Sequence, residues 1–107
     1  MSVMTHSEVQ KISEMINYQD GTIVSKTLIN KDKGSVTIFA FDKDQSLSEH
    51  TAPFDALLQV IDGEVLVVIS GKNHRLTANE MILMPANVPH AVKAVNKFKM
   101  LLIMIKS

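Results

Sequence analysis

Short β-rich runs separated by turn residues occupy this chain from Thr22 almost to its last residue. Runs of this kind, rich in β-branched and aromatic side chains, are typical of an all-β sandwich or barrel. We expect about nine strands on this pattern, at residues 22–29, 35–41, 47–51, 55–61, 64–69, 74–76, 81–84, 90–94 and 97–105.

The turns between these runs favour antiparallel pairing and closure. The dipeptide Asp62-Gly63 is a strong hairpin signal, and Pro53 marks a corner because it has no amide hydrogen to donate. So many strands in 107 residues would leave exposed edges unless the sheet closes or pairs with another copy. We therefore expect a closed barrel and a homodimer. An immunoglobulin-like sandwich is the alternative, but the chain lacks the Trp and Cys of that fold.

The amino-terminal part has a different pattern. Val9, Ile12 and Ile16 recur at helical spacing behind a capping-box pattern at Ser7 and Gln10. This predicts a short helix from Ser7 to Asn17, lying against the outside of the barrel or across a partner subunit. Residues 1–21 would then form the helix and lead-in, and residues 22–107 a single barrel domain.

Composition excludes several classes of function. Eleven Lys and Arg balance eleven Asp and Glu, so no long-range field gathers nucleic acid or an anionic membrane, and we expect neither as a partner. The absence of cysteine rules out disulfides, thiolate metal sites and cysteine nucleophiles. The first residues lack the basic patch and apolar run of a secretory signal, and the apolar runs are too short or interrupted to cross a bilayer. We expect a cytoplasmic protein.

Two spaced motifs between residues 35 and 105 resemble those of the cupin superfamily. The first motif of that family has a His-x-His pair, a Glu after a short gap and a later Gly, which here fall at His50, Ala52, Ala56 and Gly63. The second has a Gly, then Pro-x-Gly, a His and often an Asn, which fall at Asn79, Pro85, Asn87, His90 and Ala94. The resemblance implies a cupin double-stranded β-helix, an RmlC-like jelly-roll barrel with one central pocket.

The same resemblance implies a degenerate metal site. In metal-binding cupins two His and a Glu of the first motif and one His of the second converge on a metal. His50 and His90 keep two of these positions, whereas Ala52 and Ala56 replace the other two and cannot donate an electron pair. A divalent transition metal (zinc, nickel, iron, manganese or copper) would have only the two imidazoles, and no organic cofactor is implied.

Other side chains offer few replacement ligands. Asp55 adjoins the lost Glu position, but neighbouring strand residues point to opposite faces, so its carboxylate should face away from the pocket. Methionines in the second half of the barrel, with imidazole, would suit copper(I). We favour core filling or pocket lining for them, because methionine commonly has that role.

We therefore expect a cupin that binds a small molecule in a mostly apolar pocket with few polar groups. The expected ligand-binding residues are His50, His90, Phe54, Met84, Met100 and Met104, although the sequence does not fix which face of the last strand looks inward. His74 is expected at the solvated surface. A metal-dependent enzyme, dioxygenase-like or isomerase-like, and a sensing or scaffold module are the alternatives.

Overall fold

The computed structural model describes residues 7–106, and strands form most of that part. In chain order they are β1 (Ile23–Lys31), β2 (Gly34–Phe41), β3 (Ser46–His50), β4 (Asp55–Asp62), β5 (Glu64–Ile69), β6 (Lys72–Thr77), β7 (Met81–Met84), β8 (His90–Ala94) and β9 (Phe98–Ile105). The lone helical element of residues 7–106 is a 3-10 turn, η1 (Ile12–Glu14). No helix in this range is long and apolar enough to cross a membrane.

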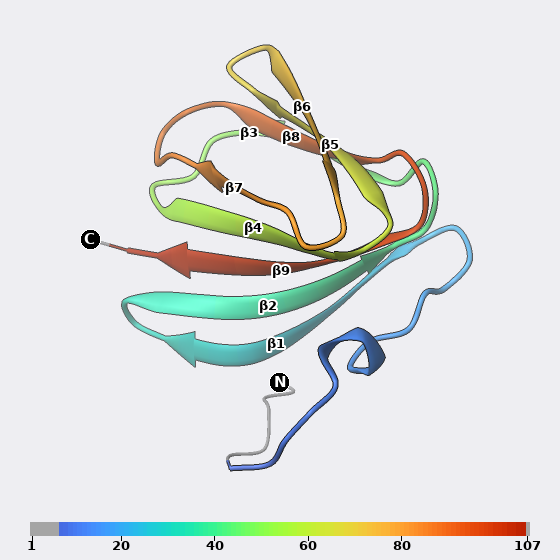
Figure 1. Cartoon of the computed structure of the whole chain (residues 1–107). Coiled ribbons are helices and arrows are strands. Elements are labelled where there is room, and N and C mark those ends of the chain that lie inside the picture. The colour runs from blue at the N-terminus through green and yellow to red at the C-terminus, as the bar shows by residue number, and fades with distance from the viewer. Residues whose placement is uncertain (1–6, 107) are drawn as a thin grey trace.

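The strands form two antiparallel sheets that face each other (Figure 1). The first has the order β1-β2-β9-β4-β7 and the second β3-β8-β5-β6. Neighbours in each sheet come from distant parts of the chain, as in β2 with β9 and β5 with β8. This is the predicted all-β jelly roll, in which alternate residues of both sheets enclose one interior.

Residues at the predicted turns have positive φ angles, which suit glycine and asparagine. Asp62-Gly63 joins β4 to β5, and Gly63 has a φ of 81°; a Cβ there would overlap the carbonyl oxygen of Lys97. Asn79 and Asn87 have φ values of 72° and 63°. Asn adopts this left-handed region more readily than other side chains. Two positions where the motif expects glycine therefore keep a glycine-like backbone.

The interior between the sheets is filled by apolar side chains from alternating strand positions. Pairing across the first sheet puts Ala56 opposite both Met84 and Met104, and Val60 opposite Met100. Even-numbered residues of β9 therefore face inward, which fixes the face that the sequence left open. The fully or nearly buried core includes Phe41, Ala56, Leu58, Val60, Val65, Val67, Leu76, Met84, Val92, Ala94, Phe98 and Met100.

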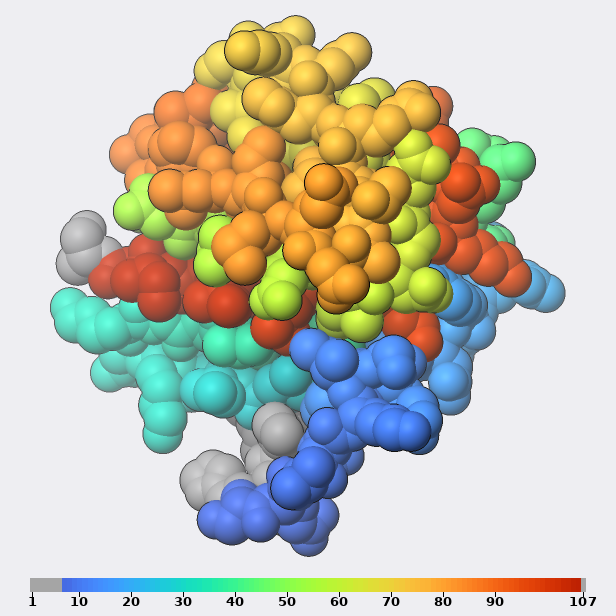
Figure 2. Space-filling view, in the orientation of Figure 1, coloured from blue at the N-terminus to red at the C-terminus, as the bar shows by residue number. Residues whose placement is uncertain are grey.

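A second apolar cluster lies on the outer face of the first sheet, where the amino-terminal segment covers it. Ile16 is buried against Ile38 and Ala40, with Met15 and Tyr18 packed beside them. Figure 2 shows this segment, in blue, along the outside of the molecule. The prediction that the segment lies against the outside of the barrel is thus confirmed.

The predicted helix from Ser7 to Asn17 is wrong, because only the 3-10 turn forms. Ser7 has a φ of 62° and cannot act as a helix N-cap, which needs an extended backbone. The carbonyl oxygen of Ser13 accepts a hydrogen bond of 2.6 Å from the buried Lys99 ammonium. A helix would need that carbonyl for its own ladder, so the tertiary contact and the helix compete.

Polar contacts complete the attachment of this segment. The Tyr18 hydroxyl donates to the Asp62 carboxylate at 2.6 Å, and the Lys99 ammonium lies 5.0 Å from the centre of the Tyr18 ring. Burial, and then the hydrogen bond to Asp62, raise the pKa of the Tyr18 hydroxyl well above its ordinary value. The phenol is therefore held in its protonated, donating form.

Candidate functional site

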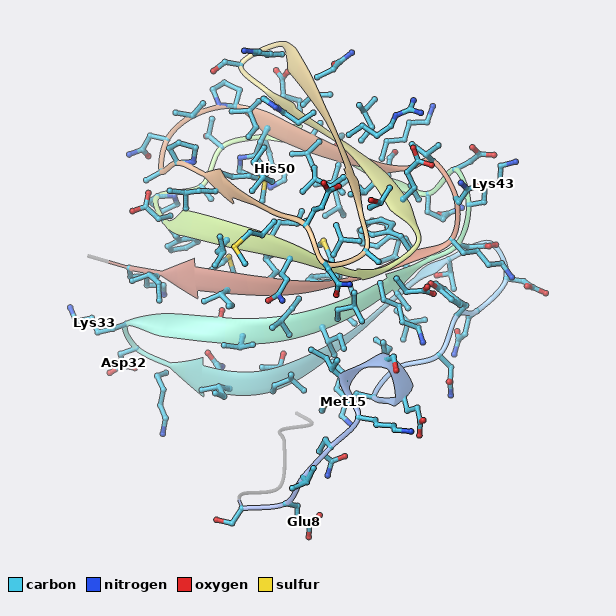
Figure 3. All side chains as sticks on the ribbon, viewed as in Figure 1. Glu8, Met15, Asp32, Lys33, Lys43 and His50 are labelled. Carbon is cyan, nitrogen blue, oxygen red and sulfur yellow. The ribbon has the colours of Figure 1, made fainter. Side chains whose placement is uncertain are left out.

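Two histidines from different strands meet at one end of the barrel. His50 ends β3 and His90 begins β8, and the two residues are paired across the second sheet. Their ring centroids are 4.4 Å apart, with the planes inclined at 66°. His90 is 6% exposed, while His50 is exposed at the rim (Figure 3). The predicted convergence of these two residues is present in the structure.

Hydrogen bonds define the protonation pattern of both rings. Nδ1 of His50 lies 2.8 Å from the carbonyl oxygen of Ser48, and Nδ1 of His90 lies 3.1 Å from that of Val88. A carbonyl oxygen can only accept, so each Nδ1 must donate its hydrogen. In the neutral ring, Nε2 then carries an unshared electron pair. The site thus presents two acceptor nitrogens, each on the side of its ring away from the supporting carbonyl.

The two rings differ in their exposure to solvent. His90 is 6% exposed, whereas His50 is exposed. Within residues 7–106 no fully buried side-chain nitrogen or oxygen lacks a hydrogen-bond partner. His50 is therefore the more accessible of the two imidazoles.

Two loops form the rim around this pair. The amide of Asn87 donates to the carbonyl oxygen of Ala52 at 2.8 Å, and the amide of Ala86 donates to the Asp55 carboxylate at 2.9 Å. On the other side the amide of Ser70 donates to the carbonyl oxygen of Pro89 at 2.9 Å. The first two bonds tie the β7–β8 loop to the β3–β4 loop and the start of β4, and the third ties it to the β5–β6 turn. Together they fix the two histidines relative to each other.

The side chains present do not fit the usual divalent metal of this kind of barrel. Ala56 is 4% exposed on the inner face, where it contributes only a methyl group. Asp55 points away to hold the Ala86 amide, as strand alternation predicts. No group of three or more His, Cys, Asp or Glu in residues 7–106 is placed to hold a metal ion. Zinc sites normally use three or four protein ligands, and hard cations need carboxylates.

The expected wall residues occupy three kinds of position. Met84 and Met100 are buried in the inner core, and Met104 is half-buried against it. Phe54 lies outside the strands on the β3–β4 loop, where the Lys106 ammonium sits 5.2 Å from its ring centre. The methionines thus line the interior, whereas Phe54 belongs to the rim.

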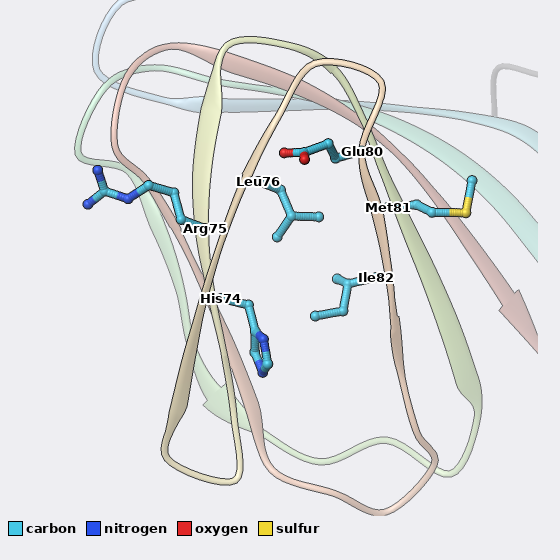
Figure 4. A pocket seen from close by; sticks show the side chains of 6 residues that line it. All are labelled: His74, Arg75, Leu76, Glu80, Met81 and Ile82. Carbon is cyan, nitrogen blue, oxygen red and sulfur yellow. The ribbon is translucent and has the colours of Figure 1, made fainter.

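The structure has a shallow cleft on another side of the barrel, which the sequence did not predict. It has a volume of about 270 Å³. It lies between β7, an edge strand of the first sheet, and β6, an edge strand of the second. Figure 4 shows His74, Leu76 and Ile82 pointing into it. His74 is half-buried there, so it stays partly solvated as the sequence predicts, but its side chain lines a cleft. Residues two apart on a strand point to the same face, so the buried Leu76 could have indicated the orientation of His74.

Glu80 lies at the end of this cleft and is held by the preceding turn. Its carboxylate accepts hydrogen bonds from the Thr77 amide at 2.8 Å and from the Thr77 hydroxyl at 3.1 Å. These bonds hold the pKa of Glu80 below its ordinary value. The carboxylate is therefore engaged in shaping the β6–β7 turn, and the cleft offers a ligand chiefly His74, Arg75 and apolar surface.

Comparison with known proteins agrees with this architecture. A family profile described as "Cupin domain" matches residues 37–106. Among proteins with curated descriptions, none matches the sequence. A conserved protein of unknown function from Streptococcus pyogenes has a solved structure with a TM-score of 0.93 and 30% identity, covering 97% of this chain and 91% of that one.

Two further solved structures are similar over most of the chain. A "Cupin 2 conserved barrel domain protein" from Leptotrichia buccalis is 45% identical, with a TM-score of 0.85, and the match covers 88% of this chain but only 46% of that one. A cupin superfamily protein from Desulfitobacterium hafniense is 22% identical, with a TM-score of 0.89, covering 100% of this chain and 97% of that one. The last of these shows similarity of fold.

Proposed function

Because this chain belongs to the cupin family, whose profile spans residues 37–106, we propose that it binds a small organic molecule at the His50–His90 end of its barrel. The observation that carries this proposal is the shared hydrogen-bond pattern of the two rings. Each Nδ1 donates to a backbone carbonyl, so both Nε2 atoms are acceptors for a ligand. A pair of oriented acceptors above an apolar interior is the usual make-up of a small-molecule site.

The chemistry of the surroundings narrows the ligand class. Ile69 is paired with His90, and Met84 and Met104 lie with it among the inward-facing apolar residues of the barrel. Neutral imidazoles accept hydrogen bonds, so the ligand must bring hydroxyl or N–H donors on an apolar frame. An ion-pairing site for a strongly anionic ligand would need lysine or arginine, and neither stands at the strand positions paired with His50 and His90.

The test is a fragment screen followed through methionine methyl groups. Protein labelled at methionine methyl carbons, kept free of metal with a chelator, would be titrated with small aromatic and aliphatic alcohols and amides. Ligand entry should shift the Met84 and Met104 resonances, while Met81, which is exposed on the same strand as Met84, should not move. The His50→Ala and His90→Ala variants should lose the response.

The opposite pattern would overturn the proposal. If ligands shift Met81 and residues of the β6–β7 cleft while Met84 and Met104 stay still, the binding site is that cleft. If no compound changes the inner methionines or the melting temperature, the barrel is better explained as a scaffold. A ligand specific for the native state should raise the melting temperature by mass action.

We also propose that the chain acts as a homodimer through the outer face of β4, β7 and β9. Leu83 is 54% exposed and Ile105 57% exposed on this face, with Leu57 and Ile103 between them. Between Asp55 and Lys99 the outward positions of these strands carry no charge, which makes the face complementary to its own copy.

Sedimentation velocity tests the dimer directly. The native chain should sediment as a dimer and Leu83→Lys as a monomer, whereas the conservative Leu83→Met should remain dimeric. A native chain that is monomeric at every concentration, or a dimer that survives Leu83→Lys with Ile105→Lys, would contradict this interface.

A further inference from the structure

The cleft between β6 and β7 lies between two strand edges that no other strand of residues 7–106 covers. β7 is the last strand of the first sheet and β6 the last strand of the second, and residues 78–80 join them. An edge strand presents N–H and C=O groups that its own sheet leaves unpaired. The cleft is therefore bordered by free backbone groups as well as by side chains.

Hydrogen bonds at this turn show which residues of β6 direct their backbone to the cleft. The amide of Thr77 donates to the Glu80 carboxylate, and the carbonyl oxygen of Thr77 accepts from the Glu80 amide at 3.1 Å. Both backbone groups of Thr77 thus point away from β5. Every second residue of an antiparallel strand shares this direction, so the N–H and C=O of Arg75 also face the free edge. The Arg75 side chain points out of the cleft (Figure 4), and its Nη1 lies 3.1 Å from the Glu64 carboxylate.

The Glu80 carboxylate has one oxygen left for a ligand. Both hydrogen bonds from Thr77 end on Oε1, and no hydrogen bond or ion pair within residues 7–106 reaches Oε2. Figure 4 shows the carboxylate extending from the β7 side over Leu76. Because the bonds from Thr77 hold the carboxylate in place, Oε2 is a positioned, negatively charged acceptor. This end of the cleft therefore favours a positively charged donor.

Apolar surface and an imidazole continue the cleft beyond this carboxylate. Leu76 and Ile82 point into it, and His74 lies two residues from Leu76 along β6 (Figure 4). The His74 ring has no hydrogen-bond or ion-pair partner within the described part of the chain, so both of its nitrogens are open to a ligand. Strand residues rise about 3.3 Å each, so Thr77 and His74 are roughly 10 Å apart, the length of about three extended residues.

We propose that the β6–β7 cleft binds the free amino end of a short extended peptide whose first side chain is apolar. The peptide ammonium donates to Oε2 of Glu80, and the first side chain packs on Leu76 and Ile82. The second residue pairs with the N–H and C=O of Arg75, antiparallel to β6. The third residue then lies opposite His74, which bonds a hydroxyl or amide side chain.

The alternation of a strand supports this arrangement. Residues paired directly across two strands point to the same face, so the first and third side chains enter the cleft and the second points to solvent. Strand addition of this kind takes its affinity from main-chain hydrogen bonds and its specificity from pockets for alternate side chains. A cleft of about 270 Å³ has room for such side chains and excludes a bulky ligand.

This inference goes beyond the small-molecule proposal, because it uses neither histidine of the His50–His90 pair. The screen for that proposal contains alcohols and amides, none of which has a free amino group. The two proposals can therefore fail separately.

The experiment is a calorimetric titration with the tripeptide Leu-Gly-Ser, amidated at its carboxyl end. The native chain should bind one equivalent. The same peptide with an acetylated amino end should bind roughly tenfold more weakly, because acetylation removes the charged donor and charge-assisted hydrogen bonds are the stronger ones. In methionine-methyl spectra the free peptide should shift Met81, which lines the cleft, and leave Met84 and Met104 unchanged.

Glu80→Gln tests the carboxylate without removing the turn. Its amide oxygen can still accept the Thr77 amide, while the negative charge is lost. Affinity for the free peptide should fall roughly tenfold, and affinity for the acetylated peptide should stay the same. Two controls should bind as the native chain does: Arg75→Lys, which changes a side chain that points out of the cleft, and Glu14→Gln, which alters an exposed carboxylate elsewhere. Thermal melts would show that each variant is folded.

Several outcomes would overturn the peptide site. One is a native chain that shows no saturable binding at millimolar peptide. Another is equal affinity for the free and the acetylated peptide, or undiminished binding by folded Glu80→Gln. Shifts at Met84 and Met104 with Met81 unchanged would place the peptide inside the barrel and not in the cleft.

Discussion

The amide of Asn87 donates to the carbonyl oxygen of Ala52 at 2.8 Å, and this bond joins the loops that carry His50 and His90. Asn87 has a φ of 63°, a conformation that few side chains tolerate. The position of the two histidines therefore depends on the backbone of Asn87, and the Asn87 side chain takes no part in this hydrogen bond.

Substitutions at Asn87 should separate backbone shape from side-chain chemistry. Asn87→Gly should change the free energy of unfolding by no more than about 0.5 kcal/mol, as at an ordinary surface position. Asn87→Val should cost about 1–3 kcal/mol, because a β-branched residue is strained at positive φ. Urea unfolding measures both. Equal costs for the two variants would show that the side chain, and not the backbone, is needed.

Gly63→Ala should be among the most damaging small substitutions in the chain. A methyl group there would overlap the carbonyl oxygen of Lys97, and the backbone φ of 81° is itself unfavourable for alanine. Backbone strain alone should cost about 1–3 kcal/mol, and the overlap adds to it. Gly71→Ala is the control, since that glycine has a similar φ of 77° but open space around it. In thermal unfolding, the melting temperature of Gly63→Ala should be well below that of Gly71→Ala.

Acid should weaken the fold through carboxylates at turns. Asp42 accepts the amides of Gly21 at 2.6 Å and Lys43 at 2.9 Å, and these bonds hold its pKa below the ordinary 3.8. A carboxyl with a depressed native pKa binds fewer protons when folded. Its stabilising contribution is therefore present above the unfolded pKa and lost as the pH falls through the native one.

The corresponding measurement is the midpoint of urea unfolding, determined at pH 7 and then at a series of lower pH values to below about pH 4. The native chain should lose stability over that range, and Asp42→Ala should lose less, because it lacks one of the contributing groups. Thr77→Val provides a second comparison: it removes the hydroxyl, but not the amide, that holds Glu80. Identical acid slopes for the native chain and Asp42→Ala would contradict this assignment.

Restoring the missing ligands should create a divalent metal site. Ala52→His with Ala56→Glu would return the two donors that the family motif expects beside His50 and His90. Nickel(II) or zinc(II) should then raise the melting temperature of the double variant by binding its native state, whereas EDTA should leave the native chain unchanged. Because Ala56 is buried between Met84 and Met104, the glutamate will also cost stability without metal. A native chain that melts much earlier in EDTA would show that it already holds such an ion.

Local patterns predicted the barrel well, because strand alternation and turn chemistry act over a few residues. The Asp62-Gly63 hairpin and the outward direction of Asp55 both follow from such rules. The register that places Ala56 between Met84 and Met104 could not be predicted, since it depends on pairing between strands far apart in the chain.

The errors also came from long-range contacts. The helical spacing of Val9, Ile12 and Ile16 is real, but Val9 is fully exposed and Lys99 takes the carbonyl of Ser13. Nothing in the local sequence indicates that a lysine from β9 is buried against that segment. The cleft lined by His74 was likewise missed, because the direction of that side chain depends on where β6 begins and on its pairing with Val67 of β5.

The central claim is that both histidines present Nε2 as an acceptor, and nitrogen-15 NMR of the imidazole side chains tests it directly. At a pH where the rings are neutral, Nδ1 of His50 and His90 should show the shift of a protonated nitrogen and Nε2 that of an unprotonated one. Protonation at Nε2 in either ring would contradict the hydrogen bonds to Ser48 and Val88, and with them the proposed ligand site.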